Sequence, residues 1–482
     1  MQHPFDISTD HLCQRLQQAL ADLDQGPSPT AAQALDRLCH AAARPGEGTP
    51  ATTGPRVAVA LADIHADLPT LVAALLADPE LAARTGASLG DGVLDRAGQQ
   101  QVQQLLAAIE RLRGWEARYP APRSERQQEY WRRLLLAGAR DARAILIDLA
   151  FRLEGMRVLV DEPDEASRRR FAGMTLAVHA PIAHRLGLGQ IKWELEDLAF
   201  RHLEPTTYVE IARLLDERRT SREAYLARTE GQLRHALVQA GIRAEVYGRP
   251  KHIYSIWGKM RRKQLSFDQL FDVRALRVQV DSVTDCYAAL SVVHELFRPI
   301  PSEYDDYIAR PKPNGYQSLH TAVEADEGKV VEIQIRTERM HAFAEFGVAA
   351  HWRYKGGGGG ENPFDMQVES LRRGLSRGEI RPLAAPMVYA FTPNGELVEL
   401  PAGATVLDFA YRIHTHLGHR CRGAKVNGQI APLKTEVANG DVVEVLTHKE
   451  PSPNREWAHA NSGFLKSASS RAKVRNWFAQ FD

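Results

Sequence analysis

Hydrophobic positions change their period about half-way along the 482-residue chain. In the first part apolar residues recur every three or four positions, as in Val57–Leu76 and Tyr130–Leu153, which is typical of amphipathic helices. Beyond Gly241, the segments Ile242–Tyr247 and Val273–Val280 alternate between apolar and polar residues, as half-buried strands do. The pattern therefore predicts an all-α region followed by a region that contains a sheet.

Strand-like and helical segments then alternate up to residue 352. The runs Gln317–Val323 and Val330–Ile335 have the length and composition of strands, whereas Thr284–Phe297 and Glu338–Trp352 have a helical period. Strands interleaved with helices in this way predict a mixed sheet in an α+β domain.

The rest of the chain begins with a linker and continues as a small unit of its own. Five consecutive glycines, Gly356–Gly360, cannot hold regular structure and predict a flexible linker. In Pro386–Leu446 a strand, an Asn-Gly turn, a returning strand, a helix and a last strand follow one another, an order that resembles a β-grasp. The predicted division of the chain is residues 1–180, 181–355, 356–385, 386–447 and 448–482.

Composition is that of an ordinary globular protein and excludes several classes. The net charge of +1 argues against a protein whose whole surface binds nucleic acid. The chain opens without a basic segment followed by an apolar one, and it has no run of about 18 apolar residues, so we expect neither a signal peptide nor a membrane span. Four scattered cysteines without a CxxC motif are expected to be reduced thiols of a cytoplasmic protein: Cys13, Cys39, Cys286 and Cys421.

A basic segment without carboxylates follows the first predicted strand. It contains six cations: Arg249, Lys251, Lys259, Arg261, Arg262 and Lys263. If a helix starts here, its backbone N–H groups favour anions, and the cations add charge-assisted hydrogen bonds to phosphate oxygens. A solvated basic helix face is the alternative interpretation.

Carboxylates on strand-like segments could complement these cations. Glu332, Gln334 and Arg336 lie two residues apart, so their side chains share one face of the predicted strand. That face is either a solvent-facing edge or a site. Together with Asp272, at the start of an earlier alternating segment, Glu332 could hold Mg²⁺ while substrate phosphates complete the ligand shell.

Aromatic and imidazole side chains add further candidates. Tyr316 can offer its ring to a nucleobase, and His320 can bind a phosphate or transfer a proton. Core packing is the alternative for Tyr316. In the helical part, His179 and His184 stand in an apolar context, which favours satisfied core or surface histidines over metal ligands.

Five motifs occur in one order: Gly248–Trp257, Phe271–Arg277, Glu303–Tyr307, Lys312–His320 and Glu332–Thr337. The set resembles the nucleotidyltransferase-like synthetase domain of the RelA/SpoT-homologue family, the (p)ppGpp synthetases, over nearly all of residues 180–355. The resemblance implies an enzyme that transfers pyrophosphate from ATP to the ribose 3′-hydroxyl of GTP or GDP. Such chemistry needs cations and Mg²⁺ around the phosphates and an aligned acceptor oxygen.

The resemblance also assigns roles within the site. Five residues would bind ATP, two arginines on the adenine and three residues on the phosphates: Arg249, Arg277, Lys251, Ser255 and Lys259. Asp272 and Glu332 would be the Mg²⁺-binding and catalytic carboxylates, with Glu332 activating the 3′-hydroxyl. Tyr316 would stack on guanine, and three residues would complete the acceptor site: Lys312, Asn314 and His320.

An acidic motif indicates the branch of the family. Bifunctional members carry a basic pattern at this place, whereas Glu303, Asp305 and Asp306 resemble the synthesis-only RelA branch. We expect three carboxylates near the nucleotides to raise the demand for divalent cations.

Residues 1–180 resemble the all-α HD-type hydrolase domain of the same family, which uses Mn²⁺ held by His and Asp. Only Asp78 matches the metal ligands of that domain. The other expected positions carry different residues: Thr53, Ala77, Leu81, Ala82, Phe151 and Gly155. Because one carboxylate does not make a transition-metal site, we expect a pseudo-hydrolase without Mn²⁺ and with a structural or regulatory role.

Residues 386–447 resemble a TGS domain, which in the RelA branch inspects the 3′ CCA end of uncharged tRNA on the ribosome. His414, His416 and His419 are candidates for contacts with those nucleotides, or they cap and pack the helix. We expect residues 448–482 to be the start of a helical region that is cut short. Docking on the ribosome belongs to the full-length family member and is left open for this chain.

The resulting prediction is a Mg²⁺-dependent GTP pyrophosphokinase with an inactive hydrolase domain and a TGS sensor. Two alternatives remain, a bifunctional synthetase and hydrolase and a catalytically idle sensor of tRNA or the ribosome. Lost metal ligands at Ala77 and Phe151 disfavour the first, and the intact set that includes Asp272 and Glu332 disfavours the second.

Overall fold

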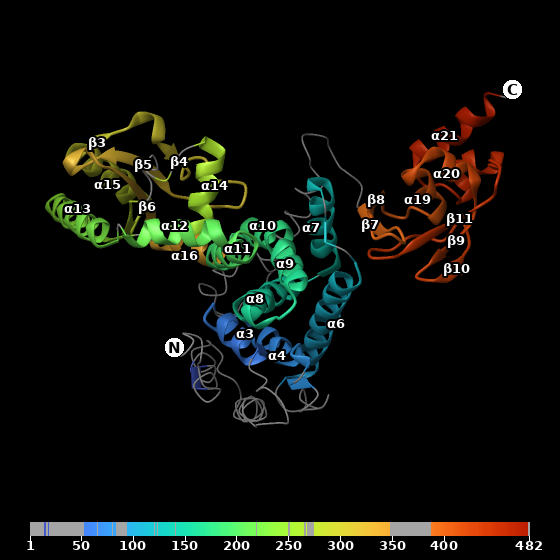
Figure 1. Ribbon diagram of the computed structural model, residues 1–482, viewed down its shortest axis with the longest axis horizontal. Helices are drawn as coiled ribbons and strands as arrows, with labels where there is room; N and C mark the ends of the chain where they lie inside the picture. The colour runs from blue at the N-terminus through green and yellow to red at the C-terminus, as the bar shows by residue number, and fades with distance from the viewer. Residues whose placement is uncertain are drawn as a thin grey trace. The chain divides into compact units, whose positions relative to one another are not determined.

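The computed structural model divides into two compact units, Met1–Val93 with Leu149–Phe364 and Leu94–Asp148 with Asp365–Asp482 (Figure 1). It describes residues 14–15, 18, 53–64, 66–79, 81–82, 94–119, 121–122, 124–139, 141–217, 219–248, 251–264, 267, 274–347 and 387–480. The predicted linker at residues 356–385 lies outside this set, as do Cys13 and Cys39.

Helices make up the first unit up to its sheet, as the hydrophobic period predicts. They are α3 (Thr53–Ala62), α4 (Leu68–Leu76), the end of α8 (Ala142–Val158), α9 (Glu165–Met174), α10 (Ala180–Arg185), α11 (Gly189–Leu203), α12 (Pro205–Glu217) and α13 (Arg219–Gln239). Aspartates start two of them, because the side chain of Asp67 accepts a hydrogen bond from Thr70 N in α4 and that of Asp164 from Ser167 N in α9.

A mixed sheet follows, with strand order β1-β2-β6-β5-β3 and β4 beside β5. The strands are β1 (Ala244–Gly248), β2 (Ala275–Val280), β3 (Arg298–Pro299), β4 (Asp305–Asp306), β5 (Leu319–Glu324) and β6 (Val330–Thr337). Among these described strands, β2 and β6 pair in parallel, and the other pairs are antiparallel. The prediction of an α+β domain with a mixed sheet is confirmed.

The two faces of this sheet have different roles. One face forms the hydrophobic core with Val278, Ile333 and their neighbours, and α13 and α15 (Val283–Leu296) cover it (Figure 1). The other face is polar, and α16 (Glu338–Phe346) packs on β2 and β6 there. Thr337 ends β6 and caps α16 through its hydroxyl, so the strand leads directly into the helix that covers the polar face.

The second unit combines helices α6 (Arg96–Arg118) and α7 (Glu125–Ala139) with a β-grasp at the C-terminal end of the chain. Its strands are β7 (Met387–Phe391), β8 (Leu397–Pro401), β9 (Cys421–Val426), β10 (Gln429–Ala431) and β11 (Val443–Thr447), and its helices are α19 (Val406–Ile413), α20 (Thr415–Arg420) and α21 (Ala468–Phe478). Asp408 completes a capping box at the start of α19 and accepts hydrogen bonds from Lys466 N and Ser467 N. Lys466 and Ser467, which lie beyond the predicted boundary at residue 447, are therefore hydrogen-bonded to the β-grasp.

Aromatic rings join α6 and α7 to the β7–β8 hairpin within this unit. Tyr119 stacks on Phe391 with ring centroids 3.6 Å apart, and the ring of Trp131 lies 5.7 Å from the same phenyl ring. Arg133 of α7 forms an ion pair of 2.8 Å with Glu399 of β8. Helices that the sequence assigns to the N-terminal domain thus form one core with strands from the C-terminal end.

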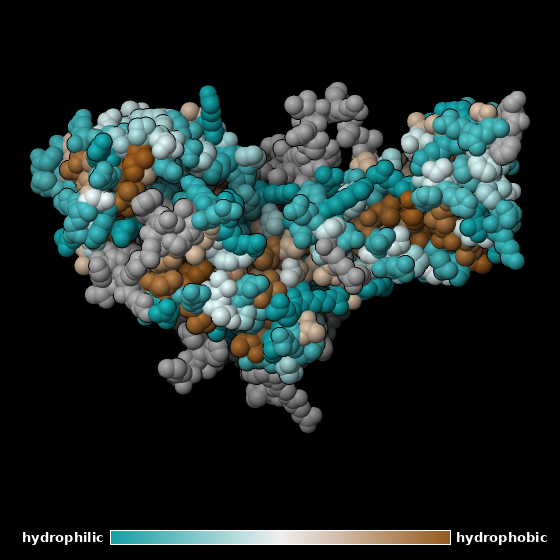
Figure 2. Space-filling model, turned by 45° about the horizontal axis from the view of Figure 1, so that its top comes forward, coloured by the Kyte–Doolittle hydropathy of each residue, from teal (hydrophilic) through white to brown (hydrophobic). Residues whose placement is uncertain are grey.

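Scattered apolar side chains reach the surface of both units (Figure 2), as is usual for globular proteins. Val209 and Val238 in the first unit and Ile430 in the second are each more than half exposed. Within the described part of the chain, no helix combines the length and the apolar character needed to cross a membrane.

Candidate active site

One row of polar residues crosses the face of the sheet that α16 covers. Tyr247, Arg277, Gln334, His320 and Asp305 are consecutive partners in the register of β1, β2, β6, β5 and β4. Since paired residues of neighbouring strands point to the same face, the pairing alone lines up these five side chains. Two of them, Gln334 and Arg277, are buried, so this face is not a solvent-facing edge.

Glu332 lies on β6 one step along the strand from this row. Its Oε1 accepts a hydrogen bond of 2.8 Å from Gln334 Nε2 and lies 3.5 Å from His320 Nδ1. The side chain is 22% exposed, which leaves the carboxylate accessible to a substrate or a cation. Asp272, its predicted partner, lies outside the described residues.

All four predicted acceptor residues line a cavity of about 200 Å³: Lys312, Asn314, Tyr316 and His320. Glu332 is linked to this cavity through His320, from which it lies 3.5 Å away. The Tyr316 hydroxyl and His320 Nε2 are 2.8 Å apart, and the ring of Tyr307 packs edge-on against both rings. Tyr316, the predicted ring for stacking on guanine, and His320, the predicted phosphate or proton ligand, are thus in direct contact.

Lys312 contributes positive charge to this cavity. Its ammonium group lies 4.1 Å from the centre of the Tyr307 ring and 5.4 Å from that of Tyr316. Burial lowers the pKa of Lys312, and the carboxylates of Asp305 and Glu332 partly oppose this shift. A negatively charged ligand in the cavity would restore the charged form.

The other wall of the cavity comes from α11 and was not foreseen as part of the site. Lys192 and Trp193 line it, together with Phe343 of α16. Lys192 also lines a second cavity of about 560 Å³, which contains Ser255, Arg261 and other residues of α14 (Ile253–Lys263). Nothing in the local sequence marks these two side chains as site residues.

Arg277 is directed toward α16. Its Nη1 donates to Glu345 Oε1 at 3.1 Å, and Nη2 of Arg336 donates to the same oxygen at 3.2 Å. The guanidinium of Arg277 also lies 5.7 Å from the ring centre of Tyr247. Burial and the neighbouring Arg277 lower the pKa of Arg336, an effect that Glu345 opposes. Stacking of Arg277 on adenine stays a prediction.

The predicted phosphate ligands lie at and along α14. Lys251 precedes the helix, Ser255 faces the larger cavity, and Lys259 follows one turn later, whereas Arg249 lies outside the described residues. The start of the helix differs from the expectation of N–H groups that bind phosphate. A carboxylate from α11 already occupies it, because Asp197 Oδ1 accepts a 2.8 Å hydrogen bond from Tyr254 N.

The acidic motif separates into three environments. Asp305 belongs to the polar row of the sheet, and exposed Glu303 lies 3.6 Å from Lys263 Nζ. Asp306 closes a turn instead, since its Oδ1 accepts hydrogen bonds from Ile308 N and Ala309 N at 3.0 and 2.8 Å. Of the three carboxylates, Asp305 is therefore the best placed toward the cavity.

Comparison with known families adds to this geometry. Residues 248–359 match the family described as "Region found in RelA / SpoT proteins", residues 31–189 match an HD domain, and residues 388–447 match a TGS domain. The chain belongs to the RelA/SpoT family. The predicted combination of HD-type, synthetase and TGS domains is thereby confirmed.

Relatives of the chain have two different names. It is 50% identical over 366 residues to a GTP pyrophosphokinase of Photobacterium angustum, covering 73% of this chain and 49% of the relative. It is 44% identical over 380 residues to a probable guanosine-3′,5′-bis(diphosphate) 3′-pyrophosphohydrolase of Synechocystis, covering 74% and 48%. The chain thus spans about half the length of these relatives. A solved structure of small alarmone synthetase 1 from Bacillus subtilis bound to its product pppGpp is 26% identical, covering 35% of this chain and 92% of that one, with a TM-score of 0.25.

The HD-type region uses its remaining metal-ligand residue for a backbone cap. Asp78 is buried, its Oδ2 accepts a hydrogen bond of 2.7 Å from Gly54 N, and its Oδ1 accepts one from Leu81 N at 3.3 Å. A Cβ at position 54 would lie 2.8 Å from that of Asp78, which explains the glycine there. Thr53 starts α3 and is exposed, whereas Ala77 is buried.

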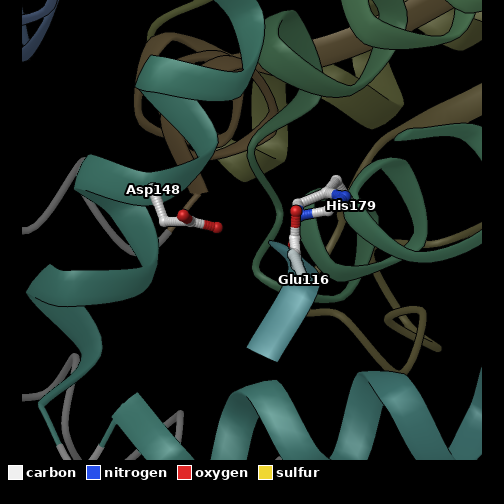
Figure 3. A group of neighbouring side chains, drawn as sticks. All are labelled: Glu116, Asp148 and His179. Carbon is white, nitrogen blue, oxygen red and sulfur yellow. The ribbon is translucent and has the colours of Figure 1, made fainter. Parts of the chain in front are cut away.

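Aromatic packing fills the neighbourhood of Gly155 on α8. A Cβ at this position would lie 2.9 Å from the ring of Phe171, over which the guanidinium of Arg152 sits at 4.1 Å. Three further titratable side chains of the helical region are labelled in Figure 3: Glu116 on α6, Asp148 on α8 and His179. His179 is buried, and its Nδ1 lies 3.4 Å from the Met174 carbonyl oxygen. None of these three occupies a position where the family resemblance places a metal ligand.

In the TGS region the predicted histidines have structural contacts. Nδ1 of His414 accepts a hydrogen bond from His416 N at the start of α20. His419 is buried, its Nδ1 lies 3.0 Å from the Tyr411 hydroxyl, and its ring lies 4.7 Å from that of Trp477. Burial lowers the pKa of His419, and nearby His416 lowers it further. Contact with a tRNA end stays a prediction for His414 and His419.

Proposed function

We propose that this chain transfers pyrophosphate from ATP to the 3′-hydroxyl of GTP or GDP and so makes (p)ppGpp. The observation that carries the proposal is the cavity lined by Lys312, Asn314, Tyr316 and His320, the last of which lies 3.5 Å from the partly exposed Glu332. The name GTP pyrophosphokinase of its 50%-identical relative supports the same activity.

The residues of the site can divide the reaction between them. The 3′-oxygen attacks the β-phosphorus of ATP and forms a new P–O bond, while the bond from that phosphorus to the oxygen bridging the α-phosphate breaks and AMP leaves with the electron pair. Glu332 takes the proton of the 3′-hydroxyl, because its carboxylate lies 3.5 Å from His320, which lines the cavity. Tyr316 holds the guanine, and Lys312 attracts the acceptor's phosphates.

A divalent metal fits the donor set. Carboxylate oxygens are the ligands that Mg²⁺ prefers, and the Glu332 side chain, which is 22% exposed, offers them from strand β6. We propose Glu332 and Asp272 as its protein ligands, with the acidic motif adding negative charge nearby. When bound, Mg²⁺ neutralises charge on the phosphates that move.

We further propose that the HD-type region does not hydrolyse the product. Asp78 is engaged by two backbone N–H groups, and Phe171 fills the space beside Gly155. These contacts favour a structural or regulatory role without Mn²⁺. The hydrolase name of the Synechocystis relative keeps a bifunctional enzyme as the second candidate.

Partners beyond the nucleotides are inferred from the TGS match. We propose that residues 388–447 recognise uncharged tRNA in the context of the ribosome, in a synthesis-only member of the family that works in the cytoplasm. Ribosome docking is proposed for the full-length family member, which has further domains.

A pair of incubations tests the activity. The purified chain is given ATP and GDP with Mg²⁺, and separately ppGpp with Mn²⁺, and the nucleotides are resolved by ion-exchange chromatography. We expect AMP and ppGpp in equal amounts from the first incubation and unchanged ppGpp in the second. Absence of AMP and ppGpp would favour an idle sensor, and loss of ppGpp with Mn²⁺ would favour the bifunctional enzyme.

A further inference from the structure

Helix α14 starts without a capping side chain of its own. Its N-cap residue is His252, whose side chain makes no hydrogen bond to the first turn. The first N–H groups of a helix lack partners inside the helix, so a cap has to come from elsewhere. This matters for the site because Lys251 directly precedes the N-cap residue and Ser255 lies in the first turn.

Helix α11 supplies the cap with one carboxylate. Asp197 Oδ1 accepts the hydrogen bond from Tyr254 N at 2.8 Å, and Oδ2 lies 3.3 Å from Nδ1 of His252. A negative charge at this end also interacts favourably with the helix dipole. Asp197 thus holds both the N-cap residue and the first turn of α14, although 57 residues separate it from Tyr254.

A second side chain of α11 holds the same histidine. The ring of Trp193, one turn before Asp197, stacks on His252 with centroids 5.0 Å apart and planes 20° apart. Residues four apart lie on one face of a helix, so Trp193 and Asp197 form a single two-point clamp on His252. We use the name α11 clamp for Trp193, Asp197 and His252.

The same helix forms part of both cavities. Trp193 lines the cavity that holds the acceptor residues, and Lys192 lines both this cavity and the one that contains Ser255. The α11 clamp therefore attaches the start of α14 to the helix that forms the acceptor wall.

We propose that Asp197 is a positioning residue that sets the start of α14, with the predicted phosphate ligands Lys251 and Ser255, against the acceptor cavity. The inference rests on the proposed function for its catalytic consequence, but the effect on donor binding follows from the clamp itself. Without the carboxylate, the first turn of α14 loses its cap, and the backbone around Lys251 and Ser255 becomes less well fixed. The positions of the acceptor residues should not change, because the cavity that contains Lys312 is lined by no residue of α14.

Three variants of the full chain separate this role from general destabilisation. Asp197→Ala removes both contacts. Asp197→Asn keeps an oxygen for Tyr254 N–H and loses the charge that faces His252. Glu204→Gln is the matched control, because Glu204 is an exposed carboxylate at the C-cap of the same helix.

The measurements are the affinity for a non-hydrolysable ATP analogue by calorimetry, the KM values for ATP and GDP, kcat, and amide hydrogen exchange at residues 251–259. From the usual effect of removing an N-cap, we expect Asp197→Ala to weaken analogue binding about five- to thirtyfold. The KM for GDP should stay unchanged, and exchange should accelerate at the start of α14. Asp197→Asn should bind the analogue much more tightly than Asp197→Ala, and Glu204→Gln should bind it as tightly as the wild type.

Each alternative result has a definite meaning. Unchanged analogue affinity in Asp197→Ala, or an equal loss of ATP and GDP binding, overturns the proposal. If the wild type binds the analogue but makes no (p)ppGpp, the proposed function fails while the binding series still decides on the clamp. A wild type that does not bind the analogue overturns both.

Discussion

Replacing Glu332 by glutamine is the most direct test of the proposed chemistry. Glutamine has the same shape and keeps an oxygen that can accept the hydrogen bond now donated by Gln334 Nε2 at 2.8 Å. It removes the negative charge and the capacity to take up a proton. The strand should stay intact, because the core residues Ile333 and Val331 on the opposite face are untouched.

The expected loss follows from the role of the carboxylate. General-base catalysis typically contributes ~10²–10⁴ in rate, so we expect turnover of Glu332→Gln to fall by about this factor. Loss of a metal ligand would add to the effect. The free energy of unfolding should change by less than about 1 kcal/mol, because the substitution is isosteric and at a partly exposed position.

The assay is the initial rate of AMP release with GDP as acceptor, with unfolding followed in parallel by circular dichroism. Glu324→Gln is the matched control, since Glu324 is an exposed carboxylate at the end of β5 and loses the same charge. Residual turnover above about one tenth of wild type would refute the assignment of Glu332 as the proton acceptor, because a base contributes more than that.

Three further predictions follow from individual contacts. Asp78→Ala should remove the acceptor of the buried Gly54 N–H group and destabilise the protein by about 1–3 kcal/mol, measured by denaturant unfolding; lost Mn²⁺ binding at unchanged stability would contradict the capping role. Because burial lowers the pKa of Lys312, its charge is lost at lower pH than that of an ordinary lysine, so the KM for GDP should rise in the alkaline range. Lys312→Arg should flatten that rise, and an identical profile would count against the explanation. Tyr119→Ala removes the ring stacked on Phe391 and should destabilise the second unit by about 3 kcal/mol, seen as faster hydrogen exchange in β7; unchanged exchange would show that the stacking is dispensable.

The alternating pattern of the strands predicts in advance which side chains of the site share a face. Alternation places Glu332, Gln334 and Arg336 on one face, and the structure shows them there, with Gln334 and Arg336 buried. The sequence could not decide between a solvent edge and a site, because that depends on what covers the face. Helix α16 covers it, and it does so through contacts of Arg277 and Arg336 with Glu345.

Carboxylates that look alike in sequence differ in structure because nearby backbone donors cannot be read from the residue type. Asp305 and Asp306 are neighbours, yet only Asp306 accepts hydrogen bonds from the following turn. Asp78 has the identity of a metal ligand but caps Gly54 N and Leu81 N. In each case the fold of the surrounding backbone determines the role.

Long-range partners were the other part that sequence reasoning missed. Asp197 is 57 residues from Tyr254, and Glu345 is 68 residues from Arg277. Both belong to helices whose periodic pattern explains them as ordinary polar positions. Their contacts become visible only when the helices are placed against α14 and the sheet.

The shared core of α6, α7 and the β7–β8 hairpin affects how shortened versions of the protein should be interpreted. The HD match at residues 31–189 and the TGS match at residues 388–447 suggest that the two domains can be cut apart. Yet Tyr119 and Trp131, both buried, pack against Phe391. A version that ends before β7 would expose these rings to water and favour aggregation. Altered activity in such a version would report on a broken folding unit as much as on a missing sensor.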